Sequence, residues 1–116
     1  MQIEQETLRA LAAASADGDG PAIPVKSRAG SAYLSVTAVN GTTPTLDVNI
    51  EEFDPATGTW HVLASFAQLA DAIGKERIEV DRIDGAEIRE QHVIGGSAGQ
   101  EFTFAVGFQG KEPDST

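Results

Sequence analysis

Strict alternation of apolar and polar residues over short stretches limits most strongly what this chain can fold into. In 101–108 (EFTFAVGF) apolar side chains occupy every second position, and 32–39 (AYLSVTAV) and 45–53 (TLDVNIEEF) repeat the pattern. Successive side chains of an extended strand point to opposite faces, so a period of two places one face in a core and the other in solvent. The pattern therefore predicts β-strands that each bury one face.

Weaker alternation follows at 59–66, 76–83 and 86–94, and 22–27 (AIPVKS) reads as a short edge strand. Gly, Asn, Asp and Pro separate these segments, as is typical of turns between antiparallel strands. No strand–helix–strand spacing is present, which disfavours a parallel sheet. We expect an all-β fold, an antiparallel, jelly-roll-like β-sandwich of about seven to eight short strands.

The inward positions of the alternating segments predict a single core between two sheets. Its expected members are Leu34, Val36, Leu46, Val48, Ile50, Trp60, Val62, Phe102, Phe104 and Val106. Residues 66–75 (FAQLADAIGK) are expected to break the strand pattern with a helical turn that ends at Gly74.

Two stretches resemble each other, 36–50 (VTAVNGTTPTLDVNI) and 92–106 (HVIGGSAGQEFTFAV). Each has an alternating segment, a glycine-containing break and a second alternating segment. Asn40-Gly41 is a strong hairpin signal, because both residues tolerate positive φ. We interpret the two stretches as two hairpins that obey the same physics, and not as a duplication.

The 116 residues correspond to one domain with extensions at both ends. We divide the chain into an N-terminal arm, 1–20, a sandwich domain, 21–110, and a polar C-terminal tail, 111–116. The arm has helix-favouring composition at 6–16 (ETLRALAAASA) but little apolar surface, and DGDG at 17–20 ends any helix. We expect the arm to be weakly ordered alone. Its large aliphatic side chains besides Met1 are Ile3, Leu8 and Leu11, which we predict to contact a partner.

Composition excludes several classes of function. The chain has 18 Asp and Glu against 8 Lys and Arg, a net charge of −10, which argues against a nucleic-acid partner. No cysteine is present, so disulfides and thiolate metal sites are excluded. No apolar run is long enough to span a membrane, and the N-terminus lacks the basic region of a secretory signal.

The chain contains one formal catalytic match, since Gly95 to Gly99 (GGSAG) fits the G-x-S-x-G nucleophile elbow. That motif needs a helix after the serine and a histidine later in the chain. Here a strand pattern follows, and His61 and His92 both precede Ser97. We therefore expect no enzyme activity, catalytic residue or small-molecule substrate.

Metal and cofactor motifs are lacking as well. Neither histidine belongs to a metal-binding spacing, and both are expected at the surface. We expect no cofactor-binding or metal-binding residues. The segment 54–60 (DPATGTW) is interpreted as a tight turn in which Asp54 accepts nearby backbone amides.

Beyond these patterns, the chain from about residue 30 to 108 resembles a class of small tailed-bacteriophage proteins. The resemblance lies in the segment Val36 to Val48, the turn Asp54 to Trp60, Ile88-Arg89, and the glycine-rich loop that leads into Phe102-Thr103-Phe104. The turn departs from the class pattern by its Pro55-Ala56-Thr57 insertion.

This resemblance implies a non-enzymatic structural protein of the virion, assembled in the host cytoplasm. It implies a capsid cement or decoration protein that binds the major capsid protein and itself, as a homotrimer. A tail or head–tail joining component is the alternative within the virion. A carbohydrate-binding sandwich module for host adsorption is the alternative of another class, and the expected burial of Trp60 argues against it.

Overall fold

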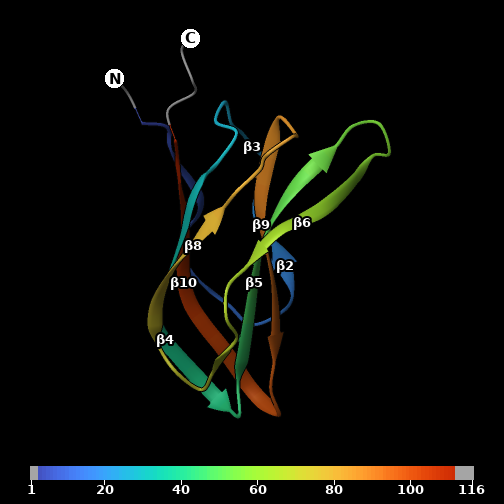
Figure 1. Cartoon of the computed structure of the whole chain (residues 1–116). Coiled ribbons are helices and arrows are strands. Elements are labelled where there is room, and N and C mark those ends of the chain that lie inside the picture. Colours follow the sequence, from blue (N-terminus) through green and yellow to red (C-terminus); the bar gives the residue numbers. More distant parts are fainter. Residues whose placement is uncertain (1–2, 112–116) are drawn as a thin grey trace.

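Two antiparallel sheets lie face to face in the computed structural model, which describes residues 3–111 (Figure 1). The four-stranded sheet has the order β1 (Gln5–Ala14), β10 (Ala98–Gly110), β4 (Gly30–Thr42) and β8 (Gly74–Val80). The six-stranded sheet has the order β2 (Gly18–Asp19), β9 (Glu87–Gly95), β5 (Thr45–Asp54) and β6 (Thr59–Ser65). Two short strands complete it, since β3 (Ile23–Pro24) pairs with β9 and β7 (Leu69–Ala70) pairs with β5. The predicted all-β antiparallel sandwich is confirmed. β3 lies within the short edge strand expected at 22–27, whereas β1, β2 and β7 were not predicted as strands.

The two similar stretches do not form hairpins. Each is a corner at which the chain leaves one sheet and enters the other, from β4 to β5 and from β9 to β10. The type I′ hairpin turn that Asn-Gly favours would need positive φ at both Asn40 and Gly41, but only Gly41 has it, at 113°. A Cβ at Gly41 would lie 2.6 Å from the Cα of Gln100, so this glycine permits close approach of the two corners.

The two corners lie side by side. Thr42 is paired with Ala98, and Thr45 is paired with Gly95. The Ser97 N–H donates to the Thr42 carbonyl at 3.0 Å. The stretches therefore resemble each other because each connects the two sheets. The first leads from the four-stranded to the six-stranded sheet, and the second leads back.

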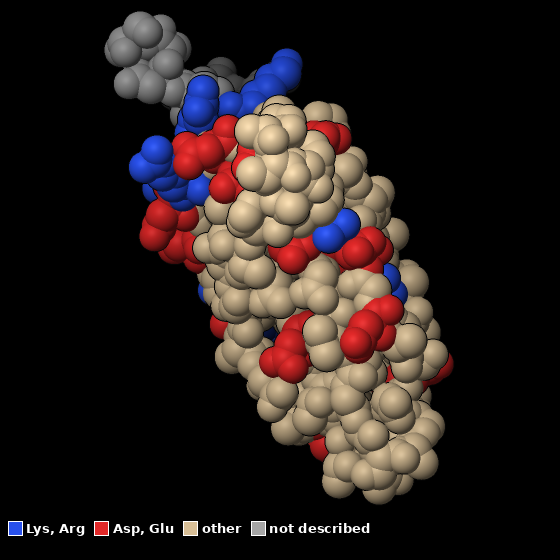
Figure 2. Space-filling view, turned by 90° about the vertical axis from the view of Figure 1, so that its right-hand side faces the viewer, with Lys and Arg blue, Asp and Glu red and all other residues tan. Residues whose placement is uncertain are grey.

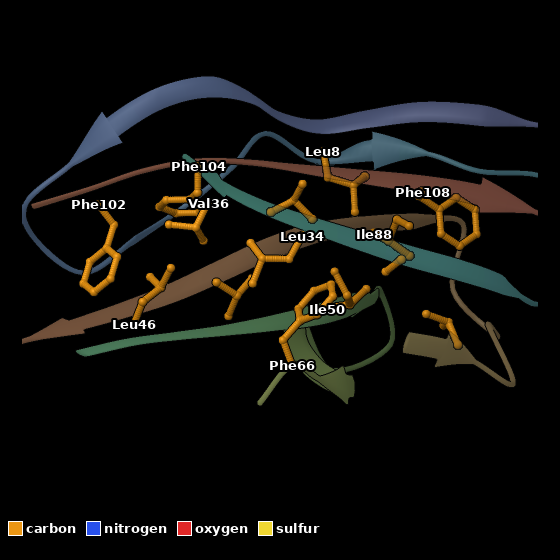
Figure 3. Packing of buried hydrophobic residues seen from close by; sticks show 14 of the residues in the cluster. Leu8, Leu34, Val36, Leu46, Ile50, Phe66, Ile88, Phe102, Phe104 and Phe108 are labelled. Atoms are coloured by element: carbon orange, nitrogen blue, oxygen red, sulfur yellow. The ribbon is translucent and has the colours of Figure 1, made fainter. Parts of the chain in front are cut away.

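The core fills the space between the sheets (Figure 3). Most of the predicted core residues are buried: Leu34, Val36, Leu46, Val48, Ile50, Phe102, Phe104 and Val106. Further buried residues complete it, among them Leu8, Phe66, Val80, Ile83, Ile88, Ile94 and Phe108. The prediction was wrong for Trp60, which is only half-buried, and for Val62, which is 56% exposed.

A β-bulge explains both errors. The pairing of β5 with β6 shifts between Ile50, which lies opposite Ala64, and Glu51, which lies opposite Val62. The extra residue of β6 is Leu63, and it reverses the phase of the strand at that point. Val62 therefore lies across from the outward-facing Glu51 instead of facing the core.

The helical turn expected at 66–75 is also not formed, and residues 3–111 contain no helix. Phe66 is buried, and its N–H donates to the Val48 carbonyl at 2.9 Å. Leu69 and Ala70 then pair with the start of β5. Pairing with an adjacent strand satisfies this backbone better than an isolated helical turn would, because one helical turn is costly to nucleate.

The N-terminal segment is a strand of the sandwich. β1 pairs with β10 from Gln5↔Gln109 to Ala14↔Phe102, despite its alanine-rich, helix-favouring composition. Burial of Leu8 and pairing with β10 override that weak local preference. Of the polar tail predicted at 111–116, all but Lys111 lies outside the described residues.

Matched truncations should separate inward from outward positions. We expect Phe104→Ala to lower the free energy of unfolding by about 3–5 kcal/mol and Leu8→Ala by about 2–5 kcal/mol, because each leaves a cavity. Val62→Ala and Leu11→Ala, at exposed positions, should each stay within about 0.5 kcal/mol. Denaturant titration measures all four, and equal losses at Leu8 and Leu11 would contradict the placement of β1.

Candidate binding surface

The outer face of the six-stranded sheet carries a row of polar side chains that hydrogen-bond across three strands. Ser65 on β6 donates its hydroxyl to Asn49 Oδ1 on β5 at 2.6 Å. The Asn49 Nδ2 in turn donates to Gln91 Oε1 on β9 at 2.8 Å. Asn49 pairs with Gln91 in the ladder, between the inward-facing neighbours Val48 and Ile50, so the row lies outward. These mutual bonds fix the rotamers of the three side chains.

A second row is centred on Arg89. Its Nε donates to Glu51 Oε1 at 2.8 Å, and its Nη1 lies 3.3 Å from Asp19 Oδ2. The guanidinium group lies 4.2 Å from the centre of the Trp60 ring, in a cation–π contact. Phe53 packs on the same indole with ring centres 5.2 Å apart. Ion pairs and aromatic contacts thus hold Trp60 on the face of the sheet.

The polar side chains of this surface are held by bonds to one another. Its donors and acceptors are fixed in place, which lowers the entropy lost when a ligand or partner binds. Figure 2, turned toward the side where β6 lies in Figure 1, shows acidic side chains scattered among uncharged residues, with few cations. The charge on this face is therefore mainly negative.

The three residues predicted to contact a partner differ in their exposure to solvent. Ile3 and Leu11 are each 57% exposed and remain available to a partner. Leu8 is fully buried in the protein's own core, so its prediction as a partner contact is wrong. Bulges before and after Arg9 turn Leu8 inward and leave Leu11 outside.

The histidines differ in their surroundings. His61 is exposed, as predicted, and its Nε2 lies 2.8 Å from the Thr59 hydroxyl. His92 was expected at the surface but is buried, with Nδ1 2.9 Å from Oε2 of the fully buried Glu90. Its ring meets the edge of the Phe104 ring at 5.3 Å. The signal was present in the sequence, because positions 90 and 92 share the inward phase of Ile88.

Ser97, the serine of the formal elbow motif, is exposed at the tip of its corner. Its hydroxyl lies 3.1 Å from that of Thr43, while His61 and His92 are engaged with Thr59 and Glu90. No serine–histidine contact is formed among residues 3–111. That Ser97 is not a nucleophile remains a prediction.

The turn at Asp54 has the predicted geometry. The Thr57 hydroxyl and the Ala56 N–H donate to its carboxylate at 2.8 and 2.9 Å, and these bonds hold the pKa of Asp54 below its usual range. A pocket of about 210 Å³ lies beside it, lined by Glu52, Phe53, Asp54, Pro55, His61, Asp84 and Gly85. Within the described part of the chain, no three metal-ligating side chains come together, and no helix could cross a membrane.

Comparison with known proteins adds little to this geometry. No family model and no curated protein matches the chain. A crystal structure of PirA aligns over 92% of this chain and 92% of its own, with 16% sequence identity and a TM-score of 0.41. A likeness at this level carries no inference about activity or partners.

Glu4 anchors the N-terminal segment to the loop after β3. Its carboxylate accepts the N–H and the hydroxyl of Ser27 at 2.9 and 2.8 Å and the Lys26 N–H at 3.1 Å. Burial opposes ionisation, but these hydrogen bonds outweigh it and hold the pKa of Glu4 below its usual range. Because the folded pKa is lowered, the stabilisation is complete above the unfolded pKa and is lost as the pH falls through the folded value.

Glu4→Gln should therefore destabilise the protein in a pH-dependent way. At pH 7 we expect a loss of about 1 kcal/mol, small for bonds to a charged group because the carboxylate is partly exposed. The difference from wild type should shrink as the pH falls below about 4.5. Urea titrations between pH 3 and 7 measure it. Glu87→Gln, at a carboxylate with no side-chain hydrogen bond among residues 3–111, is the control, and parallel curves for the two variants would contradict the assignment.

Proposed function

We propose that the protein is a non-enzymatic structural component of a tailed-bacteriophage virion that acts as capsid cement or decoration on the major capsid protein. The sequence resemblance supports this. Two of its segments, Val36 to Val48 and Gly95 to Val106, are the two corners and the strands that leave them. These two segments therefore form one contiguous structural unit, and the third, Asp54 to Trp60, is the turn between β5 and β6.

The juxtaposed corners are the observation that carries the proposal. Residues 40–46 and 94–100 contain no Asp, Glu, Lys or Arg, although the whole chain has a net charge of −10. Figure 1 places both corners at the end opposite the termini, and Figure 2 shows that end to be largely uncharged. An acidic protein can approach a lattice closely with such an end, because little charge must be desolvated there.

The corners also hold their hydroxyls in a defined position. Thr43 has φ of 48°, which is unusual for a β-branched residue, and its hydroxyl is paired with that of Ser97. Both residues are exposed. Weak contacts of this kind add up when many copies bind one particle.

The proposal can be tested by introducing charge at the two corners. Particles assembled with wild-type protein should contain it in a fixed ratio to the major capsid protein, measured by mass spectrometry and located on the head by cryo-electron microscopy. The double variant Thr43→Glu, Ser97→Glu should be incorporated at least about tenfold less, since each copy loses a repeated contact. Ala56→Glu, in the exposed β5–β6 turn near the other end, is the control.

Several outcomes would contradict the proposal. Particles that lack the chain altogether would exclude a virion component. Density on the tail or at the neck would favour the joining role. If the double variant and Ala56→Glu were incorporated equally, the corners would not contribute to binding.

A second candidate, a carbohydrate-binding module for host adsorption, is favoured by the position of Trp60. The main argument against sugar binding was the expected burial of this indole, and it is half-buried on the outer face beside Phe53 and Arg89. Binding of the purified protein to immobilised host glycans tests this function. Trp60→Ala should abolish such binding and Val62→Ala, on the same strand, should not. Absence of binding by wild type would reject it.

A further inference from the structure

The outer edge of β1 is an unpaired strand edge of the four-stranded sheet. β1 bonds to β10 on one side, and no strand formed by residues 3–111 pairs with its other side. With ten residues, it is longer than the edge strands β8 and β6, which have seven each. A strand edge displays backbone N–H and C=O groups, so the chemistry that fits it is a second β-strand.

The second half of β1 also exposes apolar side chains. Ala10, Leu11, Ala12 and Ala13 are consecutive exposed residues, and Leu11 is 57% exposed. Four consecutive exposed apolar residues on an edge are unfavourable for a monomer in water. Residues 10–14 carry no charge.

Arg9 is the cationic residue of β1, and its side chain does not extend into solvent at the strand edge. The Arg9 guanidinium lies 4.3 Å from the centre of the Phe104 ring, and its Nη2 donates to the Ala12 carbonyl at 3.0 Å. Its Nε is buried. Charged side chains on an edge strand block pairing when they extend into solvent, and Arg9 does not.

The other long edge of the same sheet is protected. β8 carries Lys75, Glu76, Arg77 and Glu79 within seven residues, and Arg77 and Glu79 pair with each other at 2.9 Å on the surface. The edge at β8 is thus protected by charge, whereas β1 has no charge over residues 10–14 and is interrupted only by the bulges beside Arg9.

We propose that β1 pairs with β1 of a second copy of this chain, antiparallel about a two-fold axis at Leu11, so that Leu11 lies opposite its own copy and two four-stranded sheets become one continuous sheet. The uncharged segment 10–14 suits a second copy because it is self-complementary. When it meets itself, no like charges face each other, although each copy carries ten excess negative charges. This inference rests on the fold and stands or falls independently of the proposed function.

Disulfide trapping tests the pairing directly, because the chain has no cysteine of its own. Leu11→Cys places one thiol on the proposed contact. Ile73→Cys places one at a comparably exposed position, 60% against 57%, outside β1. Under mild oxidation at low concentration, Leu11→Cys should form a covalent dimer at least about tenfold faster than Ile73→Cys, since pairing brings its two thiols together.

Sedimentation of the cysteine-free protein completes the test. Wild type should show a concentration-dependent mass of two chains, and Ala12→Lys should remain folded by circular dichroism but sediment as one chain. A wild-type monomer, equal trapping rates, or a trimer in which Leu11→Cys is not trapped would each overturn the proposal. So would association that Ala12→Lys leaves intact.

Discussion

The ring of Phe104 is the contact on which the rest of the sandwich depends. It belongs to β10, the strand that pairs with both β1 and β4, and it is fully buried. Arg9 of β1 lies over it at 4.3 Å, and His92 of the opposite sheet meets it edge-on at 5.3 Å. One aromatic side chain therefore joins the N-terminal strand, the central strand of one sheet and the facing strand of the other. Aromatic groups dominate the energetics of such small cores because each buries a large apolar area.

Regular alternation made the strands β4, β5 and β10 predictable. Leu34, Val48 and Phe102 are buried where a period of two places them. In β6 the bulge at Leu63 reverses the phase, and a bulge has no fixed residue signature, so Val62 could not be placed. β1 escaped prediction for another reason. Its alanine-rich sequence favours a helix in isolation, and only the long-range pairing with β10 makes it a strand.

Less of the candidate binding surface could be predicted, because its contacts join strands that are distant in sequence. The sequence did not distinguish the exposed Leu11 from the buried Leu8. The contact of Arg89 with Trp60 needs the register of β5 against both β6 and β9. Glu90 and His92 show the opposite case. Their alternation with Ile88 indicated burial, and it was overridden by the general expectation that charged residues lie at the surface.

The buried pair of Glu90 and His92 lies beside the segment that follows β1. Loss of one partner would leave a buried polar group without its hydrogen bond, which costs about 1–3 kcal/mol. The segment fits closely around the pair, since a Cβ at Gly20 would lie 2.6 Å from the Leu8 carbonyl and 3.2 Å from Glu90. β1 is thereby held from the inside by Leu8, and its outer edge is fixed before any partner arrives. A strand edge held in this way would lose little conformational entropy if a second strand paired with it.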